Sequence, residues 1–148
     1  MRHTTLSEKD TQKLGIKYGK KCKGGEVFLL SGELGTGKTQ FTKGLALGLG
    51  ITADITSPTF TYEKIYTSSK LARGNGKKGL TLYHFDLYRE IILDEDIKLL
   101  MQEAFNDEAG VTAVEWSGRM GKFLPQKYFK VQFAWSAENE RKIQIEIK

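Results

Sequence analysis

The sequence is poor in the residues that build disulfides and metal centres. It has one cysteine, Cys22, and two histidines, His3 and His84, among 148 residues. A single cysteine excludes an internal disulfide framework, and neither histidine has partners at metal-ligand spacing, so we expect Cys22 to be a small buried hydrophobe. The chain also has no apolar run long enough to span a membrane or to serve as a signal segment, and we therefore expect a cytoplasmic protein.

The composition is that of an ordinary soluble domain with a basic balance. Hydrophobic residues make up 39% of the chain, and the length suits one core, so we expect a single domain over residues 1–148. The formal net charge of +5 favours acidic partners such as nucleotides, RNA or acidic protein surfaces. Five lysines follow helical spacing near the N-terminus: Lys9, Lys13, Lys17, Lys20 and Lys21. No aromatic side chain shares their face for base stacking, so we interpret them as a solvated face rather than an RNA-binding patch.

The most informative motif is glycine-rich. Residues 32–39 read Gly-Glu-Leu-Gly-Thr-Gly-Lys-Thr and match the phosphate-binding pattern G-x-x-x-x-G-K-[ST] in full. We expect its three glycines to adopt positive φ angles, so that backbone amides approach the phosphates. Lys38 then reaches the β- and γ-phosphates, and the Thr39 hydroxyl binds a bridging Mg²⁺. The predicted nucleotide-binding residues of this segment are Glu33, Leu34, Gly35, Thr36, Gly37, Lys38, Thr39 and Gln40.

The flanking segments suit this motif. Residues 26–31 are a short apolar run typical of a buried parallel strand. After the motif, Phe41, Leu45 and Leu49 recur at four-residue steps, and Gly50 stands where a helix would end. The order is therefore strand, loop and helix, as a phosphate-binding loop requires.

The rest of the chain predicts an α/β fold. The patterns predict an N-terminal helix capped at Ser7, strands at 62–66 and 80–85 joined by a long, mobile, basic tip at 68–79, a helix over about 95–105, a strand at 111–116, and an antiparallel pair at 128–135 and 141–148. We expect a P-loop NTPase-like three-layer sandwich: a central, mostly parallel sheet with added antiparallel strands and a C-terminal hairpin.

Two acidic residues follow predicted strands. Asp86 ends the strand at 80–85, and Glu115 lies at the end of the strand at 111–116. Ligands of open α/β sheets bind beyond the carboxyl ends of the strands, so we assign Lys38, Asp86 and Glu115 to catalysis and Thr39, Asp86 and Glu115 to the metal. Which acid contacts Mg²⁺ directly, and which orients the attacking water, stays open. Ser57 and Thr59, in the loop after the motif's helix, lie where nucleotide switches place a γ-phosphate sensor.

Four segments together resemble the bacterial TsaE family, also called YjeE. They are residues 32–39, Ser-Pro-Thr-Phe-Thr at 57–61, His-Phe-Asp-Leu-Tyr-Arg at 84–89 and Val-Glu-Trp at 114–116. The resemblance implies an ATP hydrolase, weak without partner proteins, that binds the TsaB–TsaD complex and supports repeated cycles of tRNA N6-threonylcarbamoyladenosine modification. It implies cofactors ATP and Mg²⁺, and contact with tRNA that is indirect, through the complex.

The resemblance also implies roles for individual residues. Thr39 and Glu115 would hold Mg²⁺, with Asp86 close to the metal and the γ-phosphate. Thr59 would belong to the switch-like loop, and two further positions would approach the nucleotide: Thr11, and Arg141 near the base. The basic insertion at 70–78 departs from the family pattern.

Three other functions compete with this reading. A P-loop small-molecule kinase usually closes an arginine-bearing lid, and the five arginines of this chain are too scattered to form one, although Arg73 and Arg89 are candidate arginine fingers. A GTPase would carry a guanine-recognition motif, and the sequence has none. A nucleotide-gated binding module, in which bound ATP orders a surface for a partner, overlaps with the family reading.

Overall fold

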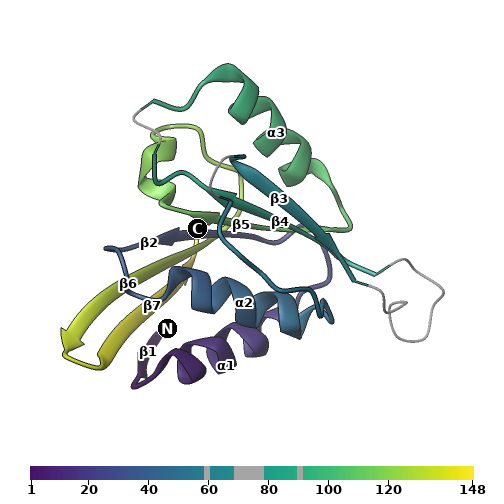
Figure 1. Cartoon of the computed structure of the whole chain (residues 1–148). Coiled ribbons are helices and arrows are strands. Elements are labelled where there is room, and N and C mark those ends of the chain that lie inside the picture. Colours follow the sequence, from purple (N-terminus) through teal and green to yellow (C-terminus); the bar gives the residue numbers. More distant parts are fainter. Residues whose placement is uncertain (59–60, 69–78, 90–91) are drawn as a thin grey trace.

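The computed structural model describes residues 1–58, 61–68, 79–89 and 92–148 (Figure 1). The elements in chain order are β1 (Arg2–Thr5), α1 (Glu8–Gly19), β2 (Val27–Ser31), α2 (Lys38–Gly48), β3 (Glu63–Thr67), β4 (Thr81–Asp86), α3 (Glu95–Asn106), β5 (Gly110–Glu115), the short 3₁₀ helix η1 (Ser117–Met120), β6 (Phe129–Ala137) and β7 (Glu140–Ile147). Among the described residues, no helix is both long and apolar enough to cross a membrane.

The strands form one mixed sheet. Its seven strands lie in the order β1-β7-β6-β2-β5-β4-β3. The central strands β6, β2, β5 and β4 run parallel, while β1, β7 and β3 are attached antiparallel at the two sides. The predicted hairpins β3–β4 and β6–β7 are both present. The basic tip predicted between β3 and β4 falls mostly on residues 69–78, outside the described residues.

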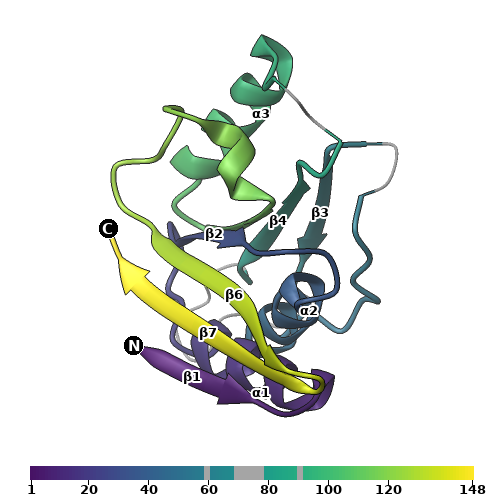
Figure 2. The ribbon, with the colours of Figure 1, turned by 90° about the vertical axis from the view of Figure 1, so that its left-hand side faces the viewer.

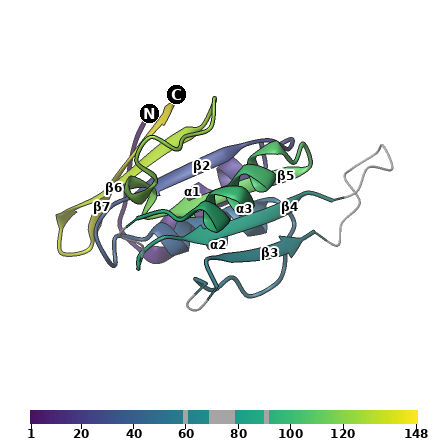
Figure 3. The ribbon, with the colours of Figure 1, turned by 90° about the horizontal axis from the view of Figure 1, so that it is seen from above.

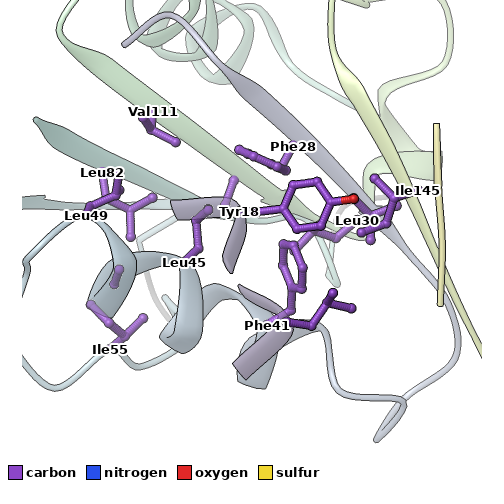
Figure 4. Close-up of a cluster of buried hydrophobic side chains, with 14 of the residues drawn as sticks. Tyr18, Phe28, Leu30, Phe41, Leu45, Leu49, Ile55, Leu82, Val111 and Ile145 are labelled. Atoms are coloured by element: carbon purple, nitrogen blue, oxygen red, sulfur yellow. The ribbon is translucent and has the colours of Figure 1, made fainter. Parts of the chain in front are cut away.

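Both faces of the central strands are buried, as the apolar run in β2 predicts. Phe28 and Leu30 pack with Phe41 and Leu45 of α2, whereas the alternate residue Leu29 faces the other way, into the cluster around α3. Helices α1 and α2 lie on one face and α3 lies on the other (Figures 2 and 3). Figure 4 shows the cluster between the sheet and the α1–α2 pair. The carboxyl ends of β2, β4 and β5 therefore open at one edge, beside the start of α2.

Helix α1 rests on α2 backbone to backbone. A Cβ added to Gly15 would lie 2.2 Å from the carbonyl oxygen of Phe41, and one added to Gly44 would lie 2.1 Å from that of Gln12. The predicted N-terminal cap of α1 is confirmed, because the Ser7 hydroxyl oxygen accepts a hydrogen bond from the backbone N–H of Asp10 at 3.1 Å. The glycine contacts fix α1, and the residues it carries, against α2.

Some local predictions differ from the structure. Cys22, expected to be buried, is only partly buried; it lies beyond the end of α1, and its thiol donates to the Tyr18 carbonyl at 3.4 Å. The predicted helix over 95–105 is present as α3, but Leu100 of its apolar pattern is 39% exposed. Strand β1 was not predicted, because Arg-His-Thr-Thr has no apolar alternation and its hydrogen-bonding partner, β7, lies at the other end of the chain.

Candidate functional site

The glycine loop (residues 32–39) joins the end of β2 to the start of α2, as predicted. The expected positive φ angles are confirmed at Gly32 (147°), Gly35 (77°) and Gly37 (103°). At Gly32 a side chain is also excluded by space, since its Cβ would lie 2.5 Å from the Phe133 carbonyl oxygen. Gly37 is the N-cap residue of α2 and has no side chain with which to cap it. The first-turn amides of α2 are therefore suited to an anionic ligand.

The side chain of Lys38 is held against the glycine loop by hydrogen bonds. Its side chain is almost fully buried, and its Nζ donates to the carbonyl oxygens of Gly32 at 2.7 Å and Glu33 at 2.8 Å. The same Nζ lies 4.1 Å from the ring centroid of Trp116. Burial lowers the pKa of Lys38, and the nearby carboxylates of Glu115 and Asp86 partly oppose this shift. A phosphate oxygen reaching the loop would find a directed cationic donor.

The two predicted acids lie side by side. Asp86 and Glu115 are register partners at the carboxyl ends of β4 and β5. Glu115 is 2% exposed, and its Oε2 accepts from the Thr39 hydroxyl at 3.0 Å. The Thr39 hydroxyl in turn lies 3.2 Å from the Ser57 Oγ. Four of the residues assigned to metal, catalysis or switch from the sequence are thus brought together.

Asp86 differs from Glu115 in its surroundings. Its Oδ1 accepts from the Tyr88 backbone N–H at 2.9 Å. Burial raises the pKa of Asp86 and the neighbouring Glu115 raises it further, while the Tyr88 hydrogen bond acts in the opposite direction. A carboxylate destabilised in this way gains from a nearby cation or from a proton.

The donor set suits Mg²⁺ bound together with phosphates. Among the described residues there is no group of three or more His, Cys, Asp or Glu side chains arranged to hold a metal ion by themselves. Mg²⁺ usually keeps several waters and takes one or two carboxylates plus phosphate oxygens, rather than an all-protein cage. The hydroxyl of Thr39 with the carboxylates of Glu115 and Asp86 fits that coordination style, and metal binding itself stays a prediction.

These groups line one cavity. It has a volume of about 550 Å³, within the range of small-molecule sites. Its lining includes the predicted residues Leu34, Gly35, Gly37, Lys38, Thr39, Gln40, Ser57, Asp86 and Glu115. Arg89 also lines it, which keeps that residue within reach of a bound ligand. Thr59 and Arg73 lie outside the described residues.

Thr11 of α1 and Arg141 of β7 lie against the glycine loop. A Cβ added to Gly37 would lie 3.4 Å from Thr11 Cγ2 and 3.6 Å from Arg141 Cδ. Thr11 is fully buried, and its hydroxyl lies 3.0 Å from that of Thr5. The guanidinium of Arg141 lies over the Trp135 ring at 4.5 Å. Both residues predicted to approach the nucleotide therefore border the glycine loop, although neither is among the cavity-lining residues.

Other loop residues have structural partners. Thr36 is buried, and its hydroxyl donates to the Glu33 carbonyl at 2.7 Å. Glu33 and Leu34 lie exposed at the loop tip. The Gln40 side chain accepts from Gln12 at 2.7 Å and donates to Glu8 at 3.1 Å, and Glu8 also lines the cavity.

Two residues that contact the site were not assigned to it from the sequence. Trp116 has a left-handed backbone (φ 58°), which turns its ring toward Lys38 and toward Tyr88, whose ring lies 4.9 Å away. His84 is fully buried and contacts Glu115. Its position two residues before Asp86, on the same side of β4, was the available signal.

In sequence and in overall structure, the chain is similar to known proteins of one family. The family model described as "Threonylcarbamoyl adenosine biosynthesis protein TsaE" matches residues 5–143. Among curated proteins, the tRNA threonylcarbamoyladenosine biosynthesis protein TsaE of Treponema pallidum is 38% identical over 98% of this chain and 99% of its own length. The Bacillus subtilis protein of the same name is 37% identical over 94% of this chain and 80% of its own. A crystal structure of Bacillus subtilis YdiB superposes with a TM-score of 0.71 at 32% identity, covering 98% of this chain and 83% of that one.

Proposed function

This chain belongs to the TsaE family, and from that premise we propose that it is a Mg²⁺-dependent ATPase of tRNA N6-threonylcarbamoyladenosine synthesis. The observation that carries the proposal is the meeting of Lys38 and Thr39, from the glycine loop, with Glu115 and Asp86, from two strand ends, at one cavity. A cationic donor, a hydroxyl and two acids at a helix N-terminus suit a polyphosphate with its metal.

Each residue has a distinct part in this proposal. The loop amides and the Lys38 ammonium bind the β- and γ-phosphates, with the phosphate oxygens replacing the loop carbonyls that Lys38 contacts. Thr39 and Glu115 would hold Mg²⁺, which would supply positive charge to offset that of the transferring phosphoryl group. Asp86 orients the attacking water, and Ser57, with Thr59, responds to the γ-phosphate. Thr11 and Arg141 hold the nucleoside side.

We extend the proposal to the chain as a whole. The fold is P-loop NTPase-like, with helix layers on both faces of the sheet, and residues 1–148 act as one domain in the cytoplasm. The protein partners are TsaB and TsaD, and the contact with tRNA runs through their complex. Hydrolysis by the isolated chain is slow and rises when the partner proteins bind.

The test is Mg²⁺-dependent release of phosphate from ATP, measured with the purified chain alone and with TsaB and TsaD. We expect turnover that rises with the partners and is lost in Glu115→Ala. The matched control is Glu108→Ala, which removes an exposed glutamate just before β5. Equal turnover in Glu115→Ala and the control would remove the proposed role of Glu115. Phosphorylation of a small hydroxyl compound, with no response to TsaB and TsaD, would favour a kinase instead.

A further inference from the structure

His84 is a buried polar side chain with one partner at the site. It lies on β4 with 0% exposure, and its Nε2 is 2.9 Å from Glu115 Oε1. Side chains alternate along a strand, so His84 shares the face of Leu82 and Asp86, the face covered by α1 and α2. His84 thus stands behind Glu115 as seen from the cavity and is not among the cavity-lining residues.

The two carboxylate oxygens of Glu115 have different partners. Oε1 meets His84, and Oε2 accepts from the Thr39 hydroxyl at 3.0 Å. A carboxylate accepts hydrogen bonds, so His84 donates to Oε1 through its Nε2–H. Because His84 binds Oε1 on the side away from the cavity, Oε2 is directed toward Thr39. The proposed function requires a metal ligand at that position.

The environment of the other ring nitrogen, Nδ1, is evidence against a purely structural role for His84. Among the described residues, Nδ1 of His84 has no hydrogen-bond partner although it is buried. An unpaired buried polar atom destabilises a fold, so an apolar residue of similar size would serve the core better. What the histidine adds over such a residue is the bond to Glu115.

We propose that His84 is a positioning residue, which fixes the orientation of the Glu115 carboxylate for binding Mg²⁺ with ATP. This inference rests on the proposed function. Hydrogen-bond partners behind a metal ligand typically change metal affinity by about 10- to 100-fold when they are removed. The bond comes from β4 to β5, so it also ties Glu115 to the strand that carries Asp86.

The test compares two variants by equilibrium binding of a non-hydrolysable ATP analogue. His84→Gln keeps an N–H donor near the position of Nε2, and His84→Leu fills the space without one. Affinity is measured in EDTA and across a Mg²⁺ titration, with the melting temperature as a control for folding. We expect His84→Leu to bind the analogue in EDTA as the wild type does, but to need about 10- to 100-fold more Mg²⁺ for the metal-dependent gain. His84→Gln should stay within about threefold of wild type on both measures.

The outcomes separate this inference from the proposed function. If the wild type gains affinity from Mg²⁺ and His84→Leu gains it at the same concentration, the positioning role is wrong and the proposed function stands. Equal loss of affinity with and without Mg²⁺ would also overturn it, because that pattern indicates a structural role. If Mg²⁺ does not change the affinity of the wild type for the ATP analogue, both the proposed metal site and the positioning role of His84 are wrong. Should His84→Leu not fold, His84→Asn, whose amide is too short to reach Glu115, is judged by the same criteria.

Discussion

The contact between α1 and α2 predicts a large effect from a very small substitution, Gly44→Ala. The added methyl would lie 2.1 Å from the carbonyl oxygen of Gln12 and 2.8 Å from its carbonyl carbon. Both atoms belong to the backbone of α1, so no side chain can rotate away. Relieving the overlap requires the two helices to separate by more than about 1 Å, which well-packed interiors resist.

The magnitude follows from two opposing terms. Overpacking of this kind destabilises a protein by about 1–3 kcal/mol, and a backbone-to-backbone overlap belongs at the upper end. In the opposite direction, alanine in place of a helical glycine stabilises the fold by about 1 kcal/mol through its higher helix propensity. We expect a net loss of about 2 kcal/mol in the free energy of unfolding, or roughly 4–8 °C in melting temperature for a chain of this size.

The assay is thermal and urea unfolding followed by circular dichroism. The matched control is Gly118→Ala in η1, where an added Cβ would have no heavy atom within 4 Å. That variant should unfold within about 0.5 kcal/mol of wild type, as surface substitutions usually do. A Gly44→Ala protein as stable as the control would refute the packing of α1 on α2, and with it the placement of Thr11 beside the glycine loop.

Three further predictions address side chains in or near the core. Lys38→Met keeps the packing on Trp116 without the charge, so ATP affinity by calorimetry should fall roughly 10- to 100-fold, with the melting temperature as a control for folding. Unchanged affinity would contradict the role of Lys38. Because burial raises the pKa of Asp86, its ionised form destabilises the fold above that pKa. At neutral pH the Asp86→Asn variant should therefore have a higher melting temperature than wild type, and the difference should shrink as the pH falls through the raised pKa of Asp86. A difference in melting temperature that does not change with pH would contradict this effect of burial on Asp86. Burial, with a smaller contribution from Glu26, raises the pKa of Cys22 to about 12. At pH 8 its thiol should therefore react with Ellman's reagent on the order of 10- to 100-fold more slowly in the folded protein than in guanidinium. Comparable rates would be evidence against the raised pKa.

The sequence predicted the elements whose structure depends on residues close together in the chain. Ile97, Met101 and Ala104 recur at helical spacing and are buried in α3. The glycine loop was predicted from its motif, because positive φ angles and a lysine at fixed spacing are local requirements. Strand β1 was missed, since its stability comes from backbone pairing with β7 rather than from its own side chains.

Much of the cavity lining was predicted from the sequence, but several contacts between its residues were not. Asp86 and Glu115 were assigned to the site because each ends a predicted strand, and the strand register places them side by side. The contact of His84 with Glu115 depends on which residues of β4 and β5 are paired, which periodicity does not specify. The approach of Trp116 to Lys38 depends on a left-handed residue at the end of β5, an uncommon conformation for a side chain of that size.

The central claim is that the glycine loop and the two strand ends form one Mg²⁺–ATP site. The most direct measurement is a crystal structure of this chain grown with Mg²⁺ and a non-hydrolysable ATP analogue. We predict the terminal phosphates against Lys38 and the loop amides, with the metal between the phosphates, Thr39 and Glu115. A nucleotide bound elsewhere, or a metal without either of those two ligands, would contradict the account.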